Sequence, residues 1–168
     1  EDQREAIVAR AAELFARQGY HATSMNQVAE AAGLSKATLY HYYKDKDALL
    51  VHIADGHVSR LQALVTEVRA KGLKPEPQLR ELVRRIVEEY ADAQHAHRVL
   101  TEDVKFLAPA DRQHVLDKER EVVAGFAAVL KPNGVVTFEF PHLLNLIEQV
   151  QFDTIYHEHF SYLSLGTV

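Results

Sequence analysis

Apolar residues recur at helical spacing along most of the chain. The first run ends at Gly19, and its members, spaced one, three or four positions apart, are Ile7, Val8, Ala11, Leu14 and Phe15. This spacing places the apolar side chains on one face of a helix. Glycine is common at the residue where a helix ends, so Gly19 is expected to end this one. A longer run keeps a comparable stripe from Leu49 to Val68, until Gly72 and Pro75 interrupt it. Both runs predict amphipathic helices.

Three further helical patterns follow these two. One begins at about Gln78 and continues to Tyr90, and a shorter piece covers residues 99–107. Pro109 then suits the first turn of a last helix that reaches toward Leu130, because proline has no N–H to leave unpaired there. Residues 1–130 are therefore predicted to form an all-α fold.

The stretch between the first two long helices carries the signals of two short helices. Ser24, followed three residues later by Gln27, forms a capping box that starts the first one. Gly33 ends it, because a sharp turn needs a residue that tolerates positive φ, and Ser35 caps the second. Two short helices joined by a three-residue turn that contains glycine are typical of a helix-turn-helix.

The second short helix presents side chains that suit DNA. With Leu39 and Tyr43 turned inward, the 100° step per residue leaves Lys44 and most of residues 36–42 facing outward or on the flank. The side chains suited to phosphate oxygens are Lys36, Thr38, Tyr40, Tyr42 and Lys46. Those better placed for base edges are Ala37 and His41. An alternative is that the tyrosines form only a packing cluster, within a helical interaction module whose motif is incidental.

A nearly unbroken series of motifs covers residues 4–50. They are Ala11-Ala12-Glu13-Leu14-Phe15, Gly19-Tyr20-His21-Ala22-Thr23-Ser24, Val28-Ala29, Ala32-Gly33-Leu34-Ser35-Lys36, Thr38-Leu39-Tyr40 and Tyr43-Lys44-Asp45-Lys46. Together they closely resemble the TetR family of transcriptional regulators. The resemblance implies a three-helix DNA-binding domain over residues 1–46, in which residues 36–42 form the recognition helix. It also implies that Ser24 and Asn26 approach the DNA backbone and that Lys46 contacts a phosphate.

The same resemblance implies a regulatory mechanism. Residues 47–130 would form a helical domain that responds to an unknown small-molecule effector, and the chain would repress transcription from a double-stranded DNA operator as a homodimer. Within this domain, His52 and His57 are expected either to line a polar part of an effector cavity or, as is commoner, to lie partly exposed on their helix. In the family, two long helices that pack against a partner subunit normally follow. Residues 131–168 depart from that pattern, so we expect a truncated regulatory domain without the usual dimer helices.

The composition of the chain changes at residues 130–134. Alanine occurs 22 times before this point and not once in residues 131–168, whereas six of the fourteen Phe and Tyr residues lie in the tail. Alanine is the best helix former and aromatic residues favour strands, so the tail predicts a strand followed by a short helix. Residues 131–168 are therefore expected to be a separate fragment.

Parts of this tail resemble an S-adenosylmethionine-dependent sugar C-methyltransferase. The two matching stretches are residues 130–141 and residues 151–164. The resemblance carries acid/base roles to Tyr156, Glu158 and His159, but no glycine-rich strand-to-helix turn precedes the tail to hold the cofactor. We therefore expect these positions to be catalytically inactive, the chain to bind no cofactor, and the protein not to be an enzyme. A methyltransferase fragment, or a non-functional hybrid of the two families, remains the alternative reading.

Net charge and cysteine content narrow the classes of protein and of binding site that remain. The net charge is −5, so DNA binding would depend on local basic groups rather than on a basic chain. Cysteine is absent, which removes disulfides and thiolate metal sites. The pairs His95 and His97, and His157 and His159, lack the spacing of a recognisable zinc motif, so no metal site is expected. Neither a membrane-spanning run nor a signal-peptide core is evident, which favours a cytoplasmic protein.

Overall fold

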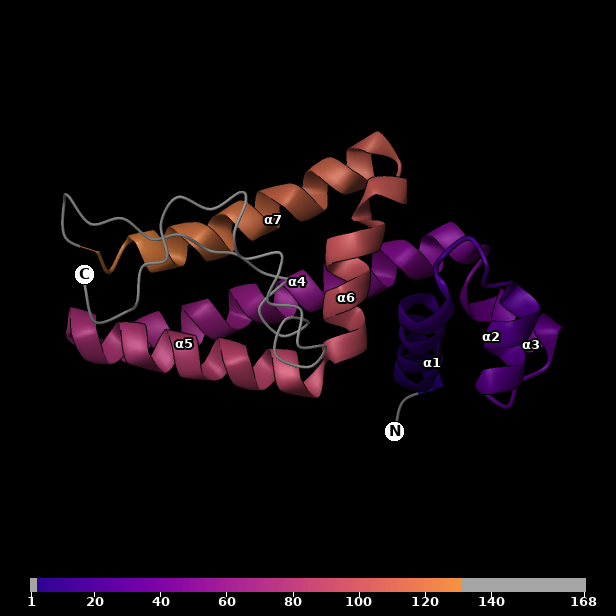
Figure 1. The fold of residues 1–168 in the computed structure, drawn as a ribbon, viewed down its shortest axis with the longest axis horizontal. Helices are drawn as coiled ribbons and strands as arrows, with labels where there is room; N and C mark the ends of the chain where they lie inside the picture. Colours follow the sequence, from indigo (N-terminus) through magenta and orange to yellow (C-terminus); the bar gives the residue numbers. More distant parts are fainter. Residues whose placement is uncertain (1–2, 131–168) are drawn as a thin grey trace, which may run out of the picture.

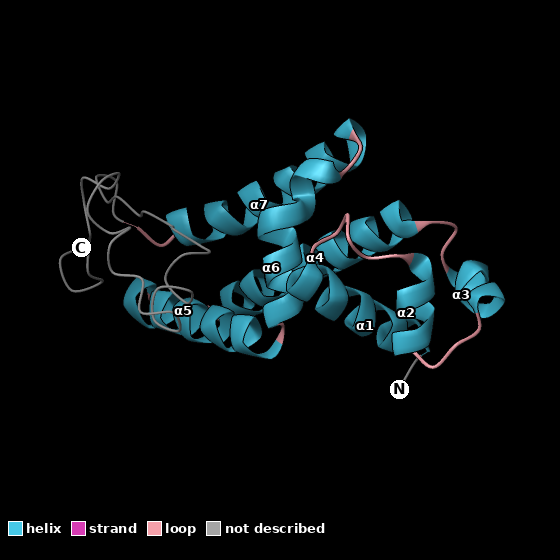
Figure 2. Cartoon of the chain, turned by 45° about the vertical axis from the view of Figure 1, so that its right-hand side comes forward, coloured by secondary structure: helices cyan, strands magenta, loops and turns pink. Residues whose placement is uncertain are grey.

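A computed structural model describes residues 3–130, and all of the regular structure in this range is helical (Figures 1 and 2). The helices are α1 (Gln3–Gln18), α2 (Met25–Ala31), α3 (Lys36–Tyr42), α4 (Lys46–Ala70), α5 (Pro75–Asp92), α6 (Gln94–Asp103), the 3-10 turn η1 (Val104–Phe106) and α7 (Pro109–Ala127). The predicted all-α fold is confirmed over this range. The strand and helix predicted for the tail, and the positions Tyr156, Glu158 and His159, lie outside the described residues.

The long helix α4 organises the fold. It packs against α1, α5, α6 and α7, and Figure 1 shows α1–α3 gathered at one end of it, with α5 and α7 running along the other end. The helix α6 crosses between these two groups and contacts both α1 and α4. The three N-terminal helices α1–α3 are therefore held as a unit against a helical body.

The ends of the helices follow the sequence signals closely, with two differences. The short helix predicted over residues 99–107 begins earlier, at Gln94, and ends at Asp103, before the 3-10 turn η1. Gly19, Gly33 and Gly72 all adopt positive φ, as expected of residues that end helices. The helix predicted from about Gln78 begins instead at Pro75, so Pro75 starts α5 rather than only breaking the stripe before it. Proline is accepted there because the first backbone N–H of a helix has no partner within the helix.

Two groups of buried side chains form the core. The larger group joins α1–α3 to the first half of α4 and to α6, and its fully buried members include Phe15, Val28 and Leu39. The smaller group lies between the second half of α4, α5 and α7, around Leu82 and Phe126. Because the larger group continues from the first three helices into α4 and α6, these three helices and the helical body share one core.

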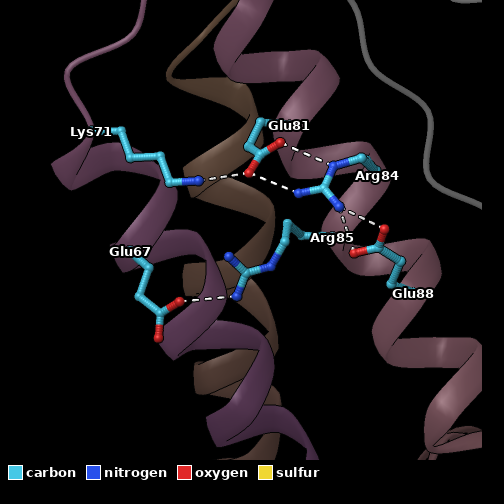
Figure 3. A network of polar contacts seen from close by, with 6 residues as sticks. All are labelled: Glu67, Lys71, Glu81, Arg84, Arg85 and Glu88. Carbon is cyan, nitrogen blue, oxygen red and sulfur yellow. Dashed lines mark hydrogen bonds and ion pairs between the residues drawn. The ribbon is translucent and has the colours of Figure 1, made fainter.

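The outer part of α4 is fastened to α5 by ion pairs as well as by apolar packing (Figure 3). The carboxylate of Glu81 receives hydrogen bonds from Lys71 and Arg84, at 2.6 and 2.9 Å, and these bonds lower the pKa of Glu81 to about 2. Arg85 also bonds Glu67 of α4, at 2.9 Å. Exposed pairs of this kind each contribute little, so the apolar contacts supply most of the stability here.

One expectation about the histidines of α4 is wrong. His52 is exposed, as expected for a surface helix position, but His57 is completely buried. Its ring lies among Tyr90 of α5 and His97 of α6, with centroid distances of 6.1 and 5.5 Å. Position 57 lies in the inward stripe of α4, four residues from both Ile53 and Leu61, but the rings that cover it come from helices distant in the sequence. None of the described helices is long and apolar enough to cross a membrane.

Candidate DNA-binding surface

The start of α2 is fixed by reciprocal hydrogen bonds between two side chains and the backbone. The backbone N–H of Gln27 donates to Oγ of Ser24 at 3.2 Å, and the N–H of Ser24 donates to Oε1 of Gln27 at 2.8 Å. The capping box predicted from the sequence is therefore present. It satisfies two backbone donors that would otherwise lack partners at the helix end.

The turn between α2 and α3 has the predicted form. Gly33 adopts φ of +67°, and the N–H of Leu34 donates to the carbonyl of Ala29 at 2.8 Å. Ser35 then caps α3, since its Oγ accepts from the N–H of Thr38 at 3.0 Å. These contacts define a helix-turn-helix, in which α3 is positioned by the turn rather than by its own length.

The inward face of the motif is apolar. Val28 and Leu39 are completely inaccessible to solvent, and Ala29 and Tyr43 are nearly so. Leu34 is partly buried and packs against the same group. The inward positions predicted for Leu39 and Tyr43 are confirmed. Because they occupy one side of α3, the other side faces solvent.

The structure places the predicted DNA-binding residues on the outside of the motif. Those that are exposed are Ser24, Asn26, Lys36, Ala37, Thr38, Tyr40 and His41, while Tyr42 is half-buried. Lys44, also predicted to face outward, is exposed just after α3. The ammonium of Lys36 lies 5.8 Å from the centroid of the Tyr40 ring, so a cation and a hydroxyl are presented together. This arrangement offers hydrogen-bond donors to an anionic surface.

Lys46 occupies a different environment from the other predicted residues. Its Nζ donates to the backbone carbonyls of Tyr20 and Thr23, at 2.8 and 2.9 Å, and lies 4.4 Å from the centroid of the Tyr20 ring. Two of its three N–H groups are thus committed to the turn between α1 and α2. Asp45 caps α4 just before it, accepting from the N–H of Ala48 at 2.7 Å.

Several residues that shape this surface were not predicted from the sequence. Gln18 donates to Oγ1 of Thr23 at 3.0 Å and to Oε1 of Gln27 at 3.3 Å, which ties the end of α1 to α2. The hydroxyl of Tyr20 donates to Asp47. These residues lie within or next to the recognisable motifs, but their partners lie in other helices or turns, so no local pattern predicts the contacts.

Two family models match the chain. The model described as bacterial regulatory proteins, tetR family, matches residues 7–53, and the model described as tetracyclin repressor-like, C-terminal domain, matches residues 72–143. The first covers the helix-turn-helix and the start of α4, and the second covers α5–α7 and continues past residue 130. The chain therefore belongs to the TetR family of transcriptional regulators.

Individual relatives agree with this assignment. The chain is 31% identical over 102 residues to the transcriptional repressor KstR2 of Rhodococcus jostii, covering 61% of this chain and 50% of that protein. A TetR-family regulator from Bordetella parapertussis superimposes with a TM-score of 0.75 and 27% identity, over 98% of this chain and 88% of that one.

A third relative belongs to another class. The chain is 52% identical over 48 residues to the C-methyltransferase NovU of Streptomyces niveus, which is 29% of this chain and 11% of the enzyme. The fragment predicted from the sequence therefore has a counterpart among known proteins. The chain spans half of KstR2 and about a tenth of NovU, so it matches only part of each.

Proposed function

We propose that the chain is a sequence-specific DNA-binding transcriptional regulator, a repressor that a small-molecule effector releases from its operator in the cytoplasm. The observation that carries this proposal is the outward face of α3, whose exposed polar side chains are Lys36, Thr38, Tyr40 and His41. The caps of α2 and α3 and the turn between them hold this helix in position. Seven helical residues span about 10 Å, which fits the major groove. Membership of the TetR family and the similarity to the repressor KstR2 support the same function.

The roles of individual residues follow from their chemistry. Ala37 and His41 would meet base edges, while Lys36, Thr38, Tyr40 and Tyr42 would bind phosphate oxygens. Ser24 and Asn26, exposed at the start of α2, would approach the DNA backbone. Lys46 has one N–H group beyond the two that it donates to carbonyls, and this group would serve a phosphate.

The experiment is a selection of duplexes from a random pool with the purified full chain. We expect enrichment of a common sequence, and two half-sites about 34 Å apart if the chain acts as a homodimer. The combined variant Lys36→Gln, Tyr40→Ala and His41→Ala should lose the enrichment. The control is Arg69→Gln, at an exposed basic position at the far end of α4, which should retain it. Equal enrichment by both variants would favour a helical interaction module with an incidental motif.

A second candidate function rests on the similarity to NovU. A segment 52% identical to a methyltransferase favours methyl transfer to a sugar or a related substrate, but the matching segment is 11% of that enzyme. Isothermal titration with S-adenosylmethionine separates the two functions. Stoichiometric binding would support the enzyme, whereas a flat titration alongside DNA selection would support the regulator.

A further inference from the structure

Three hydrogen-bond donors converge on one side-chain oxygen at the start of α2. The oxygen Oε1 of Gln27 accepts from the N–H of Ser24 at 2.8 Å, from the hydroxyl of Ser24 at 3.1 Å and from Nε2 of Gln18 at 3.3 Å. Only the oxygen of an amide can accept, so these contacts fix which end of the Gln27 amide faces the chain. Gln27 is exposed, and no group within residues 3–130 accepts a hydrogen bond from its Nε2.

The hydroxyl of Ser24 is committed to the same contacts. Its Oγ accepts from the backbone N–H of Gln27 at 3.2 Å, and its one hydrogen is directed to Oε1 of Gln27. A lone pair is what remains on this oxygen, and a phosphate oxygen is itself an acceptor. Ser24 can therefore approach the DNA backbone without a hydrogen to donate, whereas Gln27 keeps both hydrogens of its Nε2.

The Gln27 amide is held by the same turn as the ammonium of Lys46. The hydroxyl of Thr23 donates to the carbonyl of Gly19 at 2.9 Å, so its lone pair accepts from Nε2 of Gln18 at 3.0 Å. The carbonyl of Thr23 accepts from Nζ of Lys46 at 2.9 Å. Hydrogen bonds thus run without a break from Lys46 through this turn to Gln27, and both side chains keep donors beyond those that hold the turn.

We propose that Gln27 is a further DNA-contacting residue, whose Nε2 donates to a phosphate oxygen in place of the committed hydroxyl of Ser24. The first helix of a helix-turn-helix crosses the DNA backbone while the second enters the groove, so a donor at the start of α2 would meet phosphate rather than base edges. Gln18 holds this amide with its nitrogen outward. The assignment rests on the proposed DNA-binding function.

The test observes the amide itself. In the ¹⁵N-labelled full chain, each glutamine side chain gives its own pair of signals, and Gln27→Glu and Gln18→Glu identify the two pairs by their loss. We expect slower hydrogen exchange at Gln18 than at Gln27 in the free chain, because Gln18 already donates. A short random-sequence duplex at low salt, where phosphate contacts dominate, should shift the Gln27 pair saturably and slow its exchange.

The possible failures are distinguishable. A Gln27 pair that does not respond to the duplex, while backbone amides of α3 shift, would refute the contact and leave the proposed function standing. A chain in which no amide responds to the duplex would overturn both. Equal exchange at Gln18 and Gln27 in the free chain would contradict the arrangement that turns the nitrogen outward.

A matched pair of variants separates the contact from the effect of charge. Gln27→Glu keeps the cap, because glutamate serves equally in a capping box, but it replaces the donor with a carboxylate. Thermal unfolding should be unchanged, and anisotropy of the labelled duplex should show about tenfold weaker binding. Ala22→Glu adds the same charge at an exposed position of the same turn, and should weaken binding by no more than about threefold. Equal losses in the two variants would assign the effect to charge alone and refute the contact.

Discussion

The ring of Phe106 stacks on the ring of Tyr20, with centroids 5.6 Å apart and planes inclined by 17°. Phe106 ends η1, beyond α6, whereas Tyr20 lies in the turn that leads into α2. His21 meets the same phenylalanine edge-on at 4.2 Å. The body therefore contacts the DNA-binding part not only through α4 but also through an aromatic cluster next to the first short helix.

Removing this ring should loosen the contact between the two parts. We expect Phe106→Ala to lower the free energy of unfolding by about 1–2 kcal/mol, since aromatic pairs contribute beyond the area that they bury. Urea unfolding followed by circular dichroism measures the change. The control is Val87→Ala, at an exposed apolar position of α5 that should change stability by less than about 0.5 kcal/mol. Equal stability of the two variants would show that the stacking contributes nothing.

The ammonium of Lys46 should matter to the free protein as well as to the DNA complex. Lys46→Met removes two charged hydrogen bonds to the carbonyls of Tyr20 and Thr23, so we expect a loss of about 2 kcal/mol in unfolding free energy. Hydrogen exchange at the start of α2 should become faster in the absence of DNA.

A neighbouring lysine supplies the control for this prediction. Lys44 is exposed and its ammonium lies 3.8 Å from the exposed carboxylate of Asp45, so Lys44→Met should leave stability unchanged. If Lys46 also serves a phosphate, the slope of log affinity against log salt should fall by about one in Lys46→Met. A variant with wild-type stability and a reduced slope would show that Lys46 acts only on DNA.

The glycine of α7 that faces α4 should be intolerant of substitution. A Cβ built on Gly125 would collide with Cγ1 of Val65, so Gly125→Ala should destabilise the chain by about 1–3 kcal/mol through overpacking. Gly56→Ala is the matched control, because its Cβ would meet nothing closer than 3.9 Å and helix propensity favours alanine by up to about 1 kcal/mol. Thermal unfolding should shift in opposite directions for the two variants, and a shift in the same direction would contradict this packing.

Local signals in the sequence were enough to predict the helix-turn-helix. Ser24, Gln27, Gly33 and Ser35 act through hydrogen bonds or backbone angles within a few residues of themselves, and each is found in the predicted role. The inward positions Leu39 and Val28 follow from helical periodicity for the same reason. Hydrogen bonds and backbone angles within a few residues therefore determine both the helix-turn-helix and the face that it exposes.

Contacts between distant helices were not predictable in this way. The bonds from Lys46 to the carbonyls of Tyr20 and Thr23 depend on where α4 crosses the first turn. The stripe of α4 places His57 inward, but the groups that cover its ring come from α5 and α6, which no pattern within α4 identifies. The domain boundaries at residues 46 and 130, and the roles of the outward residues of α3, stay predictions.

Burial should make the stability of the body sensitive to acid. Desolvation, assisted by the charges of His97 and Arg60, lowers the pKa of His57 to about 3, and burial lowers that of His97 as well. The groups around His57 are Arg60 on α4, Glu89 and Tyr90 on α5, and His97 on α6. His57 is neutral in the folded chain at pH 7, so its approach to Glu89 at 3.8 Å is not an ion pair.

The sign of the pH effect follows from proton binding. Below about pH 6.5 the unfolded chain protonates this histidine while the folded chain does not, so acid favours unfolding and stability falls as pH decreases. For His57 alone, the loss between pH 7 and pH 5 should be about 2 kcal/mol. Urea unfolding at a series of pH values measures it. His57→Leu should remove much of this dependence, whereas His52→Leu, at an exposed position of the same helix, should leave it intact. An unchanged pH dependence in His57→Leu would assign the acid sensitivity to other groups.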